Sequence, residues 1–105
     1  MIVIEHLRDI IKENGKVHLT LHLLDRLRER KKSYHDVINA IQNGEIIEQY
    51  QNDYPHPGCL ILGKSLNDSY LHIVCGTDRE HLWIITAYYP NADKWINDFK
   101  TRKEQ

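Results

Sequence analysis

The sequence predicts an α+β fold in which N-terminal helices pack on a four-stranded antiparallel sheet, followed by a short C-terminal helix. Apolar residues recur at helical spacing up to Gly44, and after it short apolar runs alternate with polar turns. The turns are too short for parallel crossovers, which indicates an antiparallel meander. Because no linker or repeat interrupts the 105 residues, we expect one domain over residues 1–105.

The composition is that of a folded, water-soluble protein. Hydrophobic residues make up 41% of the chain and charged residues 28%. The apolar runs are far shorter than the roughly 20 residues that span a bilayer, and the N-terminal segment carries acids where a signal peptide is apolar. We therefore expect a cytoplasmic protein without a membrane partner. The net charge of −1 means that nucleic-acid binding would need a local basic patch.

The first helix is predicted by the spacing of Ile4, Leu7 and Ile11, and Gly15 is placed to end it. Residues 17–19 follow as a short extended stretch. Thr20 is a suitable N-cap for a second helix that runs to about Arg30. The apolar stripe of the second helix consists of Leu21, Leu24 and Leu27, with Leu23 beside it.

The third helix has the clearest local signals. Ser33 and Asp36 have the spacing of a capping box, with Asp in place of the usual Glu, and Gly44 closes the helix. Its apolar face consists of Val37, Ile38 and Ile41.

The second half of the chain supplies the predicted sheet. The four strands are residues 45–50, 60–64, 70–75 and 82–89, separated by a loop at 52–58 and a turn at 66–69. Trp95 and Phe99, four residues apart, would share a face of a closing helix over residues 91–99. Cys59 and Cys75 are interpreted as buried, unpaired thiols in neighbouring strands. The last three predicted strands are apolar on both faces, so one face is expected under the helices and the other forms a concavity or a partner surface.

A polar stripe on the second helix is the first candidate site. His22, Arg26 and Arg30 are spaced by four and could bind a phosphate, because guanidinium groups donate two parallel hydrogen bonds to its oxygens. The alternative is a solvated helix face on which Asp25 and Glu29 neutralise the arginines. The sequence leaves both open.

The second candidate is an imidazole within an apolar strand. Alternation places Tyr70, His72 and Val74 on one face of the strand, opposite Leu71, Ile73 and Cys75. His72 could exchange a proton near neutral pH, with Tyr88 donating a hydrogen bond beside it. Alternatively, His72 is a structural histidine with both nitrogens satisfied, and Tyr88 is a packed aromatic.

Metal and cofactor sites have little support. His18 and His22 are four apart, but Thr20 starts the helix between them and no third ligand is evident. The sequence contains neither a glycine-rich phosphate loop nor a spacing that suggests a Ser-His-Asp triad. We therefore predict no metal and no cofactor.

Several short motifs together resemble a known family. They are Leu19-Thr-Leu-His22 with Arg26 and Arg30, residues 36–50, Leu71-His72-Ile-Val, Ile85-Thr-Ala-Tyr88, Pro90 and Trp95. In order and spacing they resemble the bacterial and archaeal domain of unknown function 4258, over about residues 20–99. That family is similar to the RelE and BrnT toxins of toxin–antitoxin pairs.

The resemblance implies a RelE-like fold and a toxin that acts as a metal-independent endoribonuclease, with a small DNA-binding antitoxin as partner and RNA as substrate. His72 would be the base or acid and His22 the complementary group. Arg26 and Arg30 would bind the RNA phosphate, and Tyr88 would be an orienting donor. The near-neutral charge departs from that of typical RelE toxins, so a non-catalytic protein-binding module of the same fold is the alternative. The sequence leaves the oligomeric state open.

Overall fold

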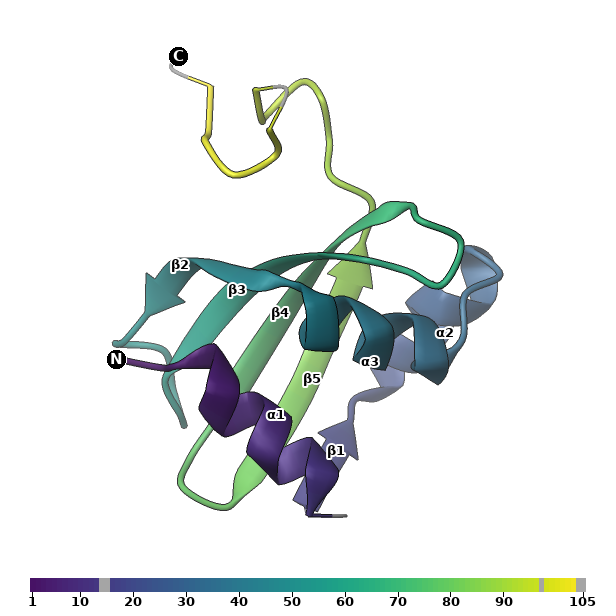
Figure 1. Ribbon diagram of the computed structural model, residues 1–105. Coiled ribbons are helices and arrows are strands. Elements are labelled where there is room, and N and C mark those ends of the chain that lie inside the picture. The colour runs from purple at the N-terminus through teal and green to yellow at the C-terminus, as the bar shows by residue number, and fades with distance from the viewer. Residues whose placement is uncertain (14–15, 97, 104–105) are drawn as a thin grey trace.

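The computed structural model describes residues 1–13, 16–96 and 98–103, and within them the chain forms three helices and five strands. The elements are α1 (Ile4–Lys12), β1 (Lys16–Leu19), α2 (Leu21–Glu29), α3 (Tyr34–Asn43), β2 (Glu45–Tyr50), β3 (Gly58–Lys64), β4 (Tyr70–Thr77) and β5 (His81–Tyr88). Figure 1 shows α1 and α3 across one face of the sheet, with α2 farther along on the β5 side. The predicted α+β class is confirmed.

The sheet has one strand more than the sequence predicted. Its order is β1-β5-β4-β3-β2, and β2 to β5 form the expected antiparallel meander. The prediction of a four-stranded, purely antiparallel sheet is wrong, because β1 adds to β5 in parallel with Val17 opposite Leu82. A parallel pair of strands needs a long crossover connection, and here the segment from α2 to β4 forms it. Residues 17–19 were expected to be extended, but four residues do not reveal a pairing partner so distant in sequence.

The start of α2 determines which of its leucines are buried. The Thr20 hydroxyl accepts the N–H of Leu23 at 3.0 Å and donates to the carbonyl of Ile85 on β5 at 2.6 Å. This contact fixes the rotation of the helix, so Leu23 and Leu27 enter the core. The predicted apolar stripe is confirmed only at Leu27; it is wrong at Leu24 and Leu21, which are 39% and 80% exposed.

The third helix matches its prediction closely. Both halves of the Ser33–Asp36 capping box form, and Gly44 is the C-cap. The core between the helices and the sheet is continuous, and Cys59 and Cys75 lie in it as free, buried register partners on β3 and β4. The expected neighbouring thiols are therefore confirmed.

The expected helix over residues 91–99 is absent from the part of this segment that the structure describes. A turn leads instead to an antiparallel bridge between Trp95 and Arg102. The Asp98 carboxylate accepts the N–H groups of Lys100 and Thr101, and such local side-chain bonds compete with helix formation.

Gly15, expected at the end of the first helix, lies outside the described residues. None of the described helices is long and apolar enough to cross a membrane.

Candidate functional site

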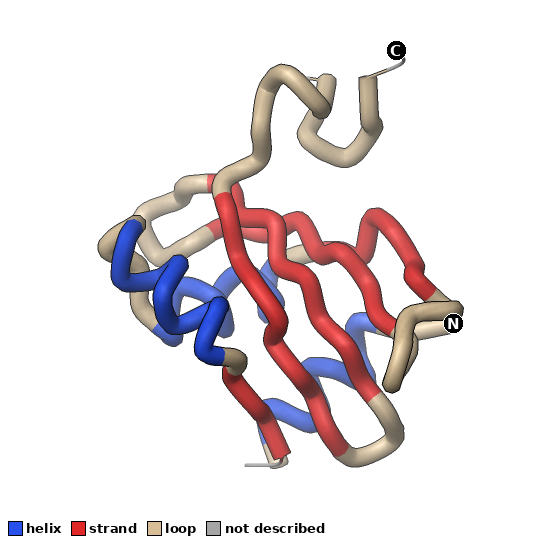
Figure 2. The backbone as a smooth tube through the Cα atoms, turned by 180° about the vertical axis from the view of Figure 1, so that it is seen from behind, coloured by secondary structure: helices blue, strands red, loops and turns tan. Residues whose placement is uncertain are grey.

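The candidate site lies on the face of the sheet that the helices leave open, which Figure 2 shows from behind. The predicted alternation on β4 is confirmed, because Leu71, Ile73 and Cys75 join the core on the helix side and His72 points the other way. The His72 side chain is nevertheless fully buried, since residues after β5 cover it. Its ring centroid lies 4.6 Å from that of Trp95.

The hydrogen bonds of His72 define its protonation state. Its Nε2 atom lies 2.8 Å from the carbonyl oxygen of Phe99. A carbonyl can only accept, so Nε2 carries a proton, and in the neutral ring Nδ1 presents a lone pair. Nδ1 is buried and has no hydrogen-bond partner among the described residues. Burial lowers the pKa of His72, which keeps the ring neutral at pH 7 with one free basic nitrogen.

A strained backbone presents the carbonyl to His72. Phe99 has a φ of 57°, in the left-handed region that bulky residues rarely adopt. Residues held in such a conformation cost about 1 to 3 kcal/mol and persist where the surrounding contacts hold them. The strained residue is therefore the one whose carbonyl covers His72.

An ion pair fixes the C-terminal segment on the sheet. The Arg102 guanidinium lies 4.6 Å from the centroid of the Trp95 ring and donates to both carboxylate oxygens of Glu48 on β2, at 2.7 and 2.9 Å. Arg102 accordingly lowers the pKa of Glu48. Lys100 pairs with Glu45 at 2.7 Å. The segment is thus held by two contacts to β2, one of them bidentate.

A cationic hollow of about 430 Å³ opens beside the covered histidine. It is lined by Arg30, Tyr88, Tyr89, Asn91, Lys94, Trp95 and Arg102. The Tyr88 ring lies 5.4 Å from that of His72, and burial raises the pKa of its phenol, so it remains a hydrogen-bond donor. A guanidinium nitrogen of Arg30, Nη1, is buried and makes no hydrogen bond within the described part of the chain. An unsatisfied buried donor of this kind suits an anionic ligand.

The structure brings only some of the predicted site residues together. Arg30 lines the hollow because it lies just beyond the end of α2, at the level where β5 ends in Tyr88. Arg26 instead pairs with Glu29 at 3.0 Å, as the solvated-face interpretation expected. His22 is exposed, about 12 Å back along the helix axis from Arg30, and is not among the residues that line the hollow.

His18 also takes a different partner from the one considered. Its Nε2 atom lies 2.8 Å from Nδ1 of His81 on the adjacent strand, while His22 lies on α2. Across residues 1–13, 16–96 and 98–103, no group of three potential metal ligands is assembled.

Sequence reasoning missed the roles of Glu48, Lys94 and Arg102. The Glu48–Arg102 pair joins residues 54 apart, and nothing local marks either residue as more than a surface charge. The sequence analysis did single out Trp95, but as a residue on the apolar face of a predicted C-terminal helix. The only signal for its role was a large aromatic just beyond the last strand.

Comparison with known proteins gives one result. No curated protein and no solved structure matches the chain. A family model, described as "Domain of unknown function (DUF4258)", matches residues 19–89, about two thirds of the chain. The match spans Arg30, His72 and Tyr88 but ends before Pro90 and Trp95, which the sequence resemblance had included. The chain therefore belongs to the family of domain of unknown function 4258.

Proposed function

We propose that this protein is the toxin of a toxin–antitoxin pair, similar to the RelE and BrnT toxins, and that it cleaves RNA in the cytoplasm without a metal. The observation that carries the proposal is the position of Arg30. Its unsatisfied guanidinium lines the same hollow as Tyr88 and Trp95, the two rings that pack against His72. Three groups thus lie close together: the Arg30 guanidinium, which can bind phosphate, the His72 imidazole with its free lone pair, and the Tyr88 phenol, which can donate a hydrogen bond.

The chemistry requires a base, an acid and a cation. The Nδ1 lone pair of His72 takes the proton of the 2′-hydroxyl as the 2′-oxygen attacks phosphorus. The bond from phosphorus to the 5′-oxygen breaks, and that oxygen takes a proton from the Tyr88 hydroxyl. Arg30 stabilises the charge on the phosphoryl oxygens. The products are a 2′,3′-cyclic phosphate and a 5′-hydroxyl. Tyr88 thereby takes the role complementary to His72 that the resemblance gave to His22.

Access to His72 is the condition for this reaction. The ring is fully buried, and Trp95 and the Phe99 carbonyl cover it. The residues after β5 must therefore lift from the sheet when RNA enters. A small DNA-binding antitoxin is the proposed protein partner, and it would act by preventing that movement or by filling the hollow.

The second candidate is a non-catalytic protein-binding module. It is favoured by the burial of His72 and by its bond to Phe99, both typical of a structural histidine. In this case the open sheet face would serve only as a binding surface for another protein.

Cleavage of a defined RNA by the purified protein in the presence of a chelator distinguishes the two candidates. His72→Ala should slow cleavage by about 10²- to 10⁴-fold, the usual contribution of a positioned proton-transfer group. Arg30→Ala should also slow it, whereas Arg26→Ala is the matched control, because Arg26 lies one turn earlier, on α2, and is paired with Glu29. His72→Phe preserves the packed ring if the alanine variant unfolds, and circular dichroism checks each variant.

The outcome assigns the function. If the wild type leaves every RNA intact and its expression does not slow growth, the binding module becomes the better assignment. If His72→Ala, His72→Phe and Arg30→Ala all cleave like the wild type, the site is elsewhere.

A further inference from the structure

A second aromatic cluster lies at the other end of the open sheet face. The Trp83 ring on β5 is nearly parallel to three imidazoles, with interplanar angles of 9° to His56, 19° to His18 and 17° to His81. The corresponding centroid distances are 4.1, 5.3 and 5.3 Å. The chemistry proposed for the hollow uses none of these rings.

Beside Trp83 the surface forms a slot of about 260 Å³. Its volume is just below the roughly 300 to 1,000 Å³ of sites for drug-sized molecules, and it suits a single flat ring system. The floor contains Gly58 and Gly76, which are register partners on β3 and β4. A Cβ atom added at Gly76 would come no closer than 3.7 Å to its neighbours, so the slot is open there.

One acid faces this slot. Asp53 lines it together with Trp83 and His56, and its carboxylate makes no hydrogen bond or ion pair with any residue that the structure describes. A carboxylate repels phosphate, so the slot does not suit the RNA backbone. The Asp53 carboxylate can only accept hydrogen bonds, which it does through two adjacent oxygens. The complementary group is therefore an aromatic ring with two adjacent N–H donors on one edge.

We propose that this slot binds a guanine base of single-stranded RNA, stacked on the Trp83 cluster with its N1–H and N2–H donated to Asp53. Of the four RNA bases only guanine has two adjacent donors on one edge. Adenine and cytosine pair one donor with an acceptor, and uracil flanks its one donor with acceptors. This inference rests on the proposed function only in taking RNA as the polymer to which the guanine belongs.

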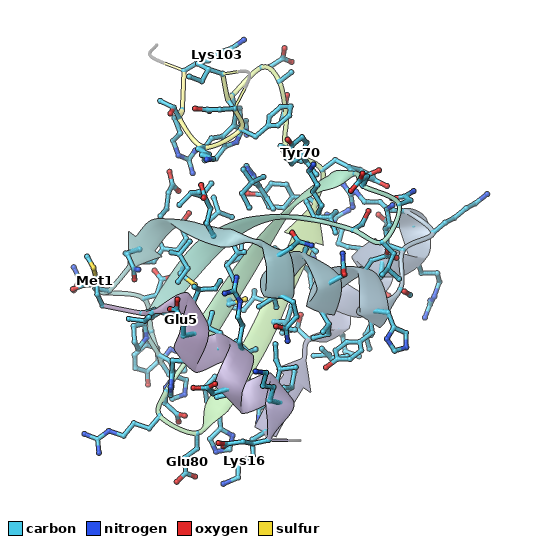
Figure 3. The ribbon with its side chains drawn as sticks, in the orientation of Figure 1. Met1, Glu5, Lys16, Tyr70, Glu80 and Lys103 are labelled. Carbon is cyan, nitrogen blue, oxygen red and sulfur yellow. The ribbon has the colours of Figure 1, made fainter. Side chains whose placement is uncertain are left out.

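The distance between the slot and the hollow allows one RNA strand to occupy both sites. Trp83 and Tyr88 are five residues apart on β5, or about 17 Å. Figure 3 shows Lys16 and Glu80, at the Trp83 end of the sheet, far from Tyr70 at the opposite end. Ile85 lines the slot, and half-buried Thr86 follows it on β5 toward Tyr88. A single strand crossing the sheet along β5 would place its guanine several nucleotides from the phosphate at Arg30, and base stacking on aromatics is a usual mode of binding such strands.

The test uses 2′-O-methyl RNA, which cannot be cleaved because its 2′-oxygen has no proton to lose. Two oligouridines with a central guanine or a central adenine are titrated by fluorescence anisotropy. The guanine oligonucleotide should bind about tenfold more tightly. Trp83→Ala should weaken its binding about 5- to 100-fold, the range that loss of one base stack implies. Asp53→Asn should equalise the two oligonucleotides, and Asp25→Asn, an exposed acid on α2, should change neither.

The results for the slot and for cleavage can be separated. Guanine-selective binding that needs Trp83 supports the slot even if ordinary RNA is never cleaved. Equal binding of both oligonucleotides, or binding unaffected by Trp83→Ala, overturns the slot whether or not the protein is a ribonuclease.

Discussion

Replacement of Gly63 by alanine should disrupt the packing of α3 on the sheet. Gly63 lies on β3 directly beneath the helix, and a Cβ atom there would lie 2.0 Å from the carbonyl oxygen of Ala40 and 2.8 Å from its Cα. Both obstacles are backbone atoms, so no side-chain rotation relieves them. Restoring an ordinary 3.4 Å contact requires α3 to move by about 1.4 Å, away from a strand to which Asn39 and Asn43 also bind.

Overpacking of a core costs about 1 to 3 kcal/mol, and a clash with backbone belongs at the upper end of that range. The entropy gained by replacing glycine offsets only about 0.4 to 1 kcal/mol. We therefore expect Gly63→Ala to lose about 2 kcal/mol or more of unfolding free energy, or roughly 10 °C in Tm for a domain of this size.

Urea unfolding followed by circular dichroism measures the loss. Gly76→Ala is the matched control, because it lies on the next strand and its Cβ would meet nothing closer than 3.7 Å. Its stability should be unchanged or slightly higher, while its extra methyl group should weaken guanine binding at the slot. Equal stability of the two variants would refute the close approach of α3 to β3.

Three further predictions concern stability. Leu23→Ala should cost about 2 to 5 kcal/mol of unfolding free energy because Leu23 is fully buried. Leu24→Ala should change the unfolding free energy by about 0.5 kcal/mol or less, and equal losses in thermal unfolding would contradict the observed rotation of α2. Lys31 follows the C-cap of α2 and has a φ of 54°, a conformation that glycine adopts without strain. Lys31→Gly should therefore raise the unfolding free energy by about 1 kcal/mol in urea titrations, and a loss would count against that geometry. Because Arg102 lowers the pKa of Glu48, their pairing stabilises the fold fully above the ordinary glutamate pKa of about 4.5, and this contribution is lost as the pH falls through the lower, folded-state pKa. Glu48→Gln should therefore flatten the dependence of Tm on pH at the acid end, and an unchanged slope would contradict the pairing.

Some of the candidate site followed from the sequence because its signals are local. The period of two on β4 was enough to place His72 opposite the core, since neighbouring strand residues point to opposite faces. The period of four grouped Arg26 with Arg30, but it could not separate them. One pairs with Glu29, and the other lies beyond the end of the helix beside Tyr88.

Local patterns in the sequence were sufficient for α1 to α3, the four antiparallel strands and the α+β class, because caps, turn residues and hydrophobic periods act between residues close together in the chain. Three features appear only in the folded chain: β1 joins β5, Leu23 is buried where Leu24 is not, and residues after β5 cover His72. Each of these depends on contacts between residues far apart in sequence, such as Thr20 with Ile85 and Glu48 with Arg102. The free energy of such contacts comes from burial and charge pairing in the folded chain, and no local pattern encodes it.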